Sequence, residues 1–182
     1  MRVLLALLLT VLTPLVLAGD LTGQDVRLWI KSMPQLEQWL DEHEDQLPED
    51  DLAYDDFSVD GMFDKGIREL RNAGLYNGFN REVKSAGYRD VEHWAEISRR
   101  VSLGYLALEM ENEQVSSAQL EAQLQQIRES DLPAEQKAMM EQMMSASLLM
   151  MKAVDGVSMA DKEAVRPYRS QLADQFGESD GE

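Results

Sequence analysis

The stretch Pro133–Val154 reads PAEQKAMMEQMMSASLLMMKAV, and its second half is apolar on most sides of a helix. A helix of that kind belongs at the centre of a bundle, with other helices packed around it. Pro133 is favoured in the first turn of a helix, and Asp155-Gly156 marks a stop. The segment therefore predicts a methionine-rich central helix.

Helix signals recur on both sides of this segment, whereas strand signals are nearly absent. Apolar residues from Val91 to Leu108 follow spacings of three and four, which is the helical period. Ser116 with Gln119 forms a capping-box pattern that predicts a helix over 117–129. Further helices are expected after Thr22, from Pro34 to Leu47, and over 62–73, 75–86, 91–111 and 158–176, where Pro167 kinks or splits the last.

This pattern predicts an all-α fold, a single-domain bundle of about seven or eight short-to-medium helices around the methionine-rich central helix. The helical domain is expected to cover residues 19–176. Residues 177–182 are polar and are expected to form a frayed tail.

Residues 1–18, MRVLLALLLTVLTPLVLA, have the pattern of a cleavable secretory signal peptide. Arg2 precedes an apolar run, and the run ends in a small-residue pattern before Gly19. Because a membrane span takes about 20 apolar residues, this run is too short to be one. We expect cleavage between Ala18 and Gly19 and a periplasmic or secreted mature protein without a membrane span. The lack of cysteine and of Asn-x-Ser/Thr sequons favours the periplasm.

The chain is strongly acidic, with a formal net charge of −17 at pH 7. Because this charge repels nucleic acid, nucleic-acid binding is not expected. From Ser32 to Asp64 there are twelve acidic residues and no Lys or Arg. This acidic stretch is either a solvated face or a docking surface for a cationic partner. The candidate contact residues within it are Asp50, Asp51, Asp55 and Asp56.

Six methionines fall within the predicted central helix. The simplest interpretation is that they fill the core, since methionine adapts to irregular packing. A second interpretation is a flexible hydrophobic binding face, and a third is a soft Cu(I) site of thioether ligands. The candidates for partner binding are Met139, Met140, Met143 and Met144; the other two are Met150 and Met151.

The segment Leu132–Met144, LPAEQKAMMEQMM, resembles the helix-opening LTxxQ motif of Spy/CpxP-like periplasmic chaperones. Pro133 stands where that motif has threonine. A second copy is absent, because the sequence from Leu21 to Gln24 has its glutamine one position early. The resemblance implies a stress or chaperone-type protein with a basic, cradle-shaped surface, whereas this chain is acidic.

No catalytic or cofactor motif is found: the sequence lacks a Gly-x-Ser-x-Gly elbow, a Walker loop and a dinucleotide fingerprint. Asp56–Gly61 resembles the first half of an EF-hand loop, but Ile67 stands where the loop needs a bidentate glutamate. A protein that handles copper or calcium is an alternative function. We expect an exported, non-catalytic, cofactor-free helical binding protein for a hydrophobic or cationic protein partner; the oligomeric state stays open.

Overall fold

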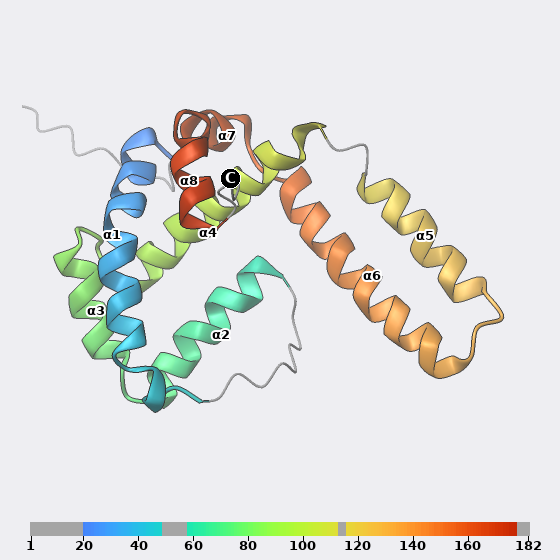
Figure 1. Ribbon diagram of the computed structural model, residues 1–182, viewed down its shortest axis with the longest axis horizontal. Coiled ribbons are helices and arrows are strands. Elements are labelled where there is room, and N and C mark those ends of the chain that lie inside the picture. The colour runs from blue at the N-terminus through green and yellow to red at the C-terminus, as the bar shows by residue number, and fades with distance from the viewer. Residues whose placement is uncertain (1–19, 49–57, 113–115, 178–182) are drawn as a thin grey trace, which may run out of the picture.

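The computed structural model describes residues 20–48, 58–112 and 116–177, and within these ranges the fold is an all-α bundle (Figure 1). This confirms the predicted fold class. The described α-helices are α1 (Gly23–Asp41), α2 (Val59–Asn72), α3 (Tyr76–Ser85), α4 (Val91–Glu109), α5 (Ser117–Glu129), α6 (Ala134–Asp155), α7 (Met159–Val165) and α8 (Arg169–Gln175). Short 3-10 helices are η1 (Glu44–Gln46), η2 (Met110–Asn112) and η3 (Arg166–Tyr168).

The core is centred on α4, which runs through the middle of the molecule and contacts α1, α2, α3, α6 and α7 (Figure 1). Its buried residues extend from Val91 at one end to Leu108 at the other. Small residues such as Ser98 and Ala107 are buried among them, which lets neighbouring helices approach from several sides. The predicted stripe from Val91 to Leu108 therefore marks the true central helix.

The prediction of a methionine-rich central helix is wrong. α6 forms a hairpin with α5 that projects from the bundle (Figure 1). Met151 and Val154, near the end of α6 that meets α4, are buried, whereas Met139 is 61% and Met143 is 66% exposed. α5 covers one side of α6 and α4 covers only its last turns, so apolar composition on all sides of this helix does not mean burial.

The expected break at Pro34 is also wrong, because α1 continues through this residue. Proline inside a helix removes one hydrogen bond and costs about 3 kcal/mol. Trp29 before it and Leu36 after it are both buried on the core side of α1. Burial of apolar residues on both sides of Pro34 offsets the local penalty and keeps one continuous helix.

Most other helix ends agree with the sequence. α5 has the predicted bounds and the capping box at Ser116, and Pro167 lies in η3, which separates α7 from α8. Gly74 and Gly87 follow α2 and α3 with φ of 75° and 108°, the left-handed conformation that favours glycine. The predicted signal peptide and residues 178–182 lie outside the described residues. No helix in the described ranges is both long and apolar enough to cross a membrane.

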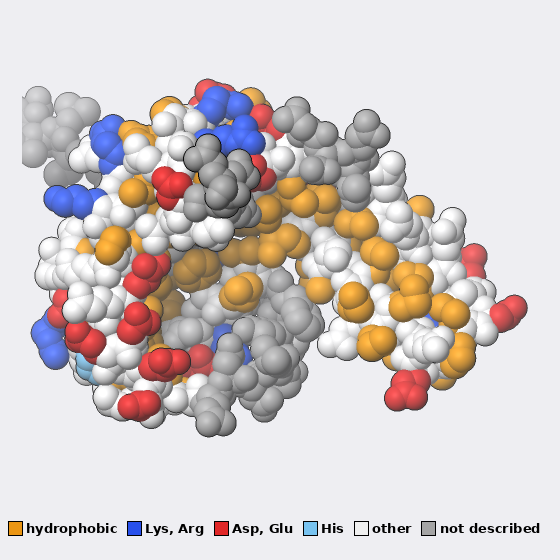
Figure 2. Space-filling model, viewed as in Figure 1, with side chains coloured by type: hydrophobic (Ala, Val, Ile, Leu, Met, Phe, Trp, Pro, Cys, Tyr) orange, Lys and Arg blue, Asp and Glu red, His pale blue; other side chains and the backbone are white. Residues whose placement is uncertain are grey.

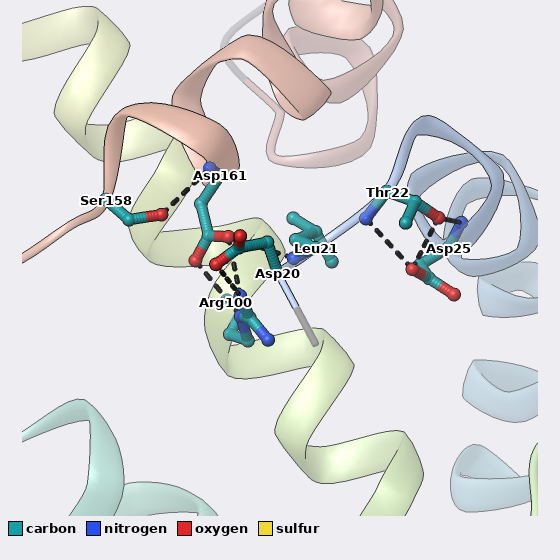
Figure 3. A network of polar contacts seen from close by, with 7 residues as sticks. All are labelled: Asp20, Leu21, Thr22, Asp25, Arg100, Ser158 and Asp161. Atoms are coloured by element: carbon teal, nitrogen blue, oxygen red, sulfur yellow. Dashed lines mark hydrogen bonds and ion pairs between the residues drawn. The ribbon is translucent and has the colours of Figure 1, made fainter. Parts of the chain in front are cut away.

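A polar network ties the start of α1 to α4 and α7 (Figure 3). The backbone N–H of Leu21 donates to Asp161 Oδ1 at 3.0 Å. Arg100 donates to the same carboxylate through Nη2 at 2.6 Å and through Nε at 3.0 Å. Burial alone would raise the pKa of Asp161, but the bonds from Arg100 and Leu21 outweigh it and hold the pKa below its usual value.

Gly104 of α4 packs closely against α7. A Cβ atom at Gly104 would lie 2.9 Å from Cγ2 of Val165, which is fully buried. Overpacking costs about 1–3 kcal/mol, and the gain of alanine over glycine in a helix, roughly 1 kcal/mol, opposes it. We therefore expect Gly104→Ala to lower the free energy of unfolding by up to about 2 kcal/mol.

Urea denaturation followed by circular dichroism measures this effect. Gly66→Ala in α2 is the matched control, because nothing lies within 4 Å of its added Cβ. That variant should be unchanged or more stable. Equal destabilisation of the two variants would show that helix contact at Gly104 is not the cause.

Candidate interaction surface

The α5–α6 hairpin is held together by apolar contacts inside it and ion pairs along its edges. Leu124 and Ile127 of α5 are buried in the hairpin. Lys152 Nζ lies 2.6 Å from Glu121 Oε1 near the base of the hairpin. Near the turn, Arg128 Nε lies 3.6 Å from Glu141 Oε2 and the Arg128 carbonyl accepts a hydrogen bond from Lys137. These pairs show that the helices run antiparallel and that one side of α6 faces α5.

The sides of α6 that do not face α5 carry an exposed apolar surface (Figure 2). Met139, Met140 and Met143 are 61%, 42% and 66% exposed. Met144 is half-buried, because it lies on the same side of the helix as Glu141 and therefore faces α5. We call the exposed set the methionine surface; its members are Met139, Met140, Met143 and Leu149 of α6, together with Leu132, which lies just before the helix.

The methionine surface carries almost no charge. Between Ala138 and Met151 the only charged residue is Glu141, which pairs with Arg128 on the α5 side. Five of the eight large hydrophobic side chains that are exposed in the described ranges belong to this surface. Because exposed apolar patches on soluble proteins mark interaction sites, the neighbouring side chains of Met139, Met140 and Met143 have the character of a binding site. Methionine suits this role, since its unbranched thioether adapts to different partners.

A second apolar feature is a groove between the end of α1, α2 and α4, with a cavity volume of about 350 Å³. The indole ring of Trp94 packs edge-on against Phe79 at 5.1 Å and Phe63 at 6.1 Å. Its Nε1 is buried and has no hydrogen-bond partner among the described residues. No local pattern in the sequence predicts this groove, because its lining comes from separate parts of the chain: Leu40, Leu47, Met62, Phe63, Ile67, Leu70, Phe79 and Trp94.

The acidic candidates Asp50, Asp51, Asp55 and Asp56 lie outside the described residues. Two other acids of the same stretch make internal contacts. Glu37 accepts a hydrogen bond from Gln175 at 3.1 Å, and Asp64 lies 3.6 Å from Arg99. This part of the acidic stretch therefore contributes to the packing of the bundle.

The segment Asp56–Gly61, which resembles the first half of an EF-hand loop, is not a loop after Ser58. Ser58 caps α2, and the helix begins at Val59, so Gly61 lies within a helix. Among the described residues, no group of three or more His, Cys, Asp or Glu side chains is placed to hold a metal ion.

Of the two sets of candidate residues, the acidic set lies outside the described residues and the methionine set lies within them. Met139, Met140 and Met143 come together on one exposed surface, and Met144 lies at its edge. The interpretation that the methionines fill the core did not predict that these three side chains are exposed. No protein-family model, curated protein or solved structure matches the chain.

Proposed function

We propose that this protein is an exported, non-catalytic binding protein that presents the methionine surface to a protein partner. The observation that carries the proposal is the exposure of Met139, Met140 and Met143 on a hairpin that stands out from the bundle (Figure 2). Export rests on the leader pattern of residues 1–18. The lack of catalytic activity rests on the absence of any catalytic motif in the sequence.

The chemistry of the surface favours an apolar partner. Covering a half-exposed methionine contributes on the order of 1 kcal/mol, about half of what full burial is worth. Because the surface is uncharged, this gain comes with little desolvation of polar groups. A partner that offers an apolar helix face or strip of similar length would bind here.

Replacing Met143 with glutamate is expected to reduce partner capture at least tenfold, the effect of losing about 1.4 kcal/mol of binding free energy. The carboxylate would be desolvated in the middle of the contact. Met143 is 66% exposed, so the fold should tolerate the change. Affinity capture from the exported fraction of the source cells, quantified by mass spectrometry, measures the difference.

Met159→Glu is the matched control, because Met159 is 65% exposed but lies in α7, outside the methionine surface. This variant should capture as much as the wild type. The proposal would be wrong if both variants lost capture equally. It would also be wrong if the wild type neither captured a protein nor self-associated.

A second function is favoured by the same exposed methionines. The resemblance of Leu132–Met144 to the chaperone motif implies that the surface holds partly unfolded chains. Capture of many denatured proteins by the wild type and by Met159→Glu, but not by Met143→Glu, would favour this function. Capture of one folded partner would favour a specific binding protein.

A further inference from the structure

Three of the exposed methionines lie within about one turn of α6. Met143 comes four residues after Met139 and three residues after Met140. Residues at these two spacings are neighbours on a helix, with about 5–6 Å between their Cβ atoms. Because helical side chains lean toward the N-terminus, Met143 extends back toward the turn that carries the other two. We call these three residues the methionine triad.

The side chains of the methionine triad are open to solvent. Met139 is 61%, Met140 is 42% and Met143 is 66% exposed, so an ion reaches them without any opening of the fold. Methionine is unbranched and has three rotatable bonds, so the three sulfur atoms can turn toward one point. Glu141 lies on the other side of the helix and pairs with Arg128 of α5. The triad therefore offers three sulfur ligands that no neighbouring carboxylate of α6 shares.

Ligands of this kind select a soft cation. Thioether sulfur suits Cu(I), whereas Ca²⁺ takes oxygen ligands and Zn²⁺ takes thiolate, imidazole and carboxylate ligands. Three uncharged thioethers leave the single positive charge of Cu(I) on the complex. The chain has a net charge of −17 at pH 7, so its overall field attracts a cation to the protein.

We propose that the methionine triad binds one Cu(I) ion through its three thioether sulfur atoms. This function does not rest on the capture of a protein partner, because it uses the sulfur atoms and not the apolar area. Once one thioether holds the ion, the other two are already close by, so the triad binds more tightly than a single methionine. Met62 and Met159 provide the comparison, since they are 50% and 65% exposed and have no other methionine within four residues.

Titration of the chain from Gly19 to Glu182 with Cu(I), without oxygen, tests the proposal residue by residue. The readout is the NMR spectrum of the methionine methyl groups. We expect the methyl signals of the triad to shift together and to stop shifting at one equivalent, while the signal of Met159 stays in place. The same amount of Zn²⁺ or Ca²⁺ should leave the triad signals unchanged. Equal shifts at Met159 and at the triad, or no shift at the triad, would overturn the proposal.

Met143→Leu separates the sulfur atom from the apolar area. Leucine keeps the size and the helix propensity of methionine, so the fold should be preserved. We expect the affinity for Cu(I) to fall roughly tenfold or more, because Met143 neighbours both other members of the triad. Met159→Leu in α7 is the matched control and should bind Cu(I) as the wild type does. Competition with a coloured Cu(I) chelator of known affinity measures the difference, and equal affinity of Met143→Leu and wild type would contradict the assignment.

The outcomes separate this inference from the proposed function. Met143→Leu should still capture the protein partner, because leucine keeps the apolar surface, whereas Met143→Glu should not. A chain that captures its partner but binds no Cu(I) would overturn the metal site and leave the proposed function standing. A chain that binds Cu(I) at the triad but captures no protein would support the metal site and overturn the proposed function.

Discussion

Replacing Asp161 with asparagine is expected to lower the free energy of unfolding by about 2–4 kcal/mol. Asp161 is only 8% exposed and accepts hydrogen bonds from the Leu21 backbone and from two nitrogens of Arg100. Asparagine removes the negative charge and leaves the guanidinium of Arg100 without its nearest counter-ion. The loss is smaller than for a fully buried pair, because the Arg100 side chain keeps 22% of its exposure. Urea denaturation at pH 7 measures it.

The pH dependence of this variant identifies the charge as the cause. The folded-state pKa of Asp161 lies below the ordinary value of 3.8, so its ionisation stabilises the fold above that pH. This contribution is lost as the pH falls through the lower folded-state pKa. The difference between wild type and Asp161→Asn should therefore shrink below about pH 3.8. Asp155→Asn, at the exposed end of α6, should change stability little; an equal loss in both variants would contradict the assignment.

Phe79→Ala is expected to lower the free energy of unfolding by about 3–5 kcal/mol. The Phe79 side chain is fully buried and its ring lies 5.3 Å from Trp39 and 5.1 Å from Trp94. Alanine removes the ring and leaves a cavity where α1, α3 and α4 meet. A chain of this size should lose about 6–20 °C in Tm, which thermal unfolding by circular dichroism measures.

Phe176→Ala is the control for this prediction. Phe176 also stacks on aromatic rings, at 5.1 Å from Tyr105 and 5.7 Å from Trp29, but it is 40% exposed. The loss should be about 1–2 kcal/mol, since much of its surface stays in water in the fold. Similar losses in the two variants would mean that the core at Phe79 collapses around the cavity.

Local signals in the sequence predicted the helix ends well. Ser116 and Gln119 form their capping box within one turn, and Gly74 and Gly87 end helices because of their own backbone conformation. Such features depend on residues that are close in the chain. They can therefore be recognised without knowing how the helices pack.

Packing could not be predicted in the same way. The helix continues through Pro34 because Leu36, two residues later, is buried in the core. α4, not α6, is central because its small buried residues let several helices approach at once. Apolar composition alone placed α6, and not α4, at the centre of the bundle.

The candidate site was predicted in part. The sequence singled out Met139, Met140 and Met143 as a set, but their exposure depends on which helices cover α6. The groove beside Trp94 needs residues from Leu40 to Trp94 in one place, and no local pattern marks it.

The bond from Leu21 to Asp161 joins residues 140 positions apart, and this separation sets an order of events during synthesis. Synthesis proceeds from the N-terminus at about 5–20 residues per second, so Asp161 is made roughly 7–28 seconds after Leu21. During that interval the backbone N–H of Leu21 lacks its native acceptor, whereas Thr22 can already bond to the carboxylate of Asp25. The connection of the start of α1 to α4 and α7 is therefore completed only when nearly the whole chain has been made.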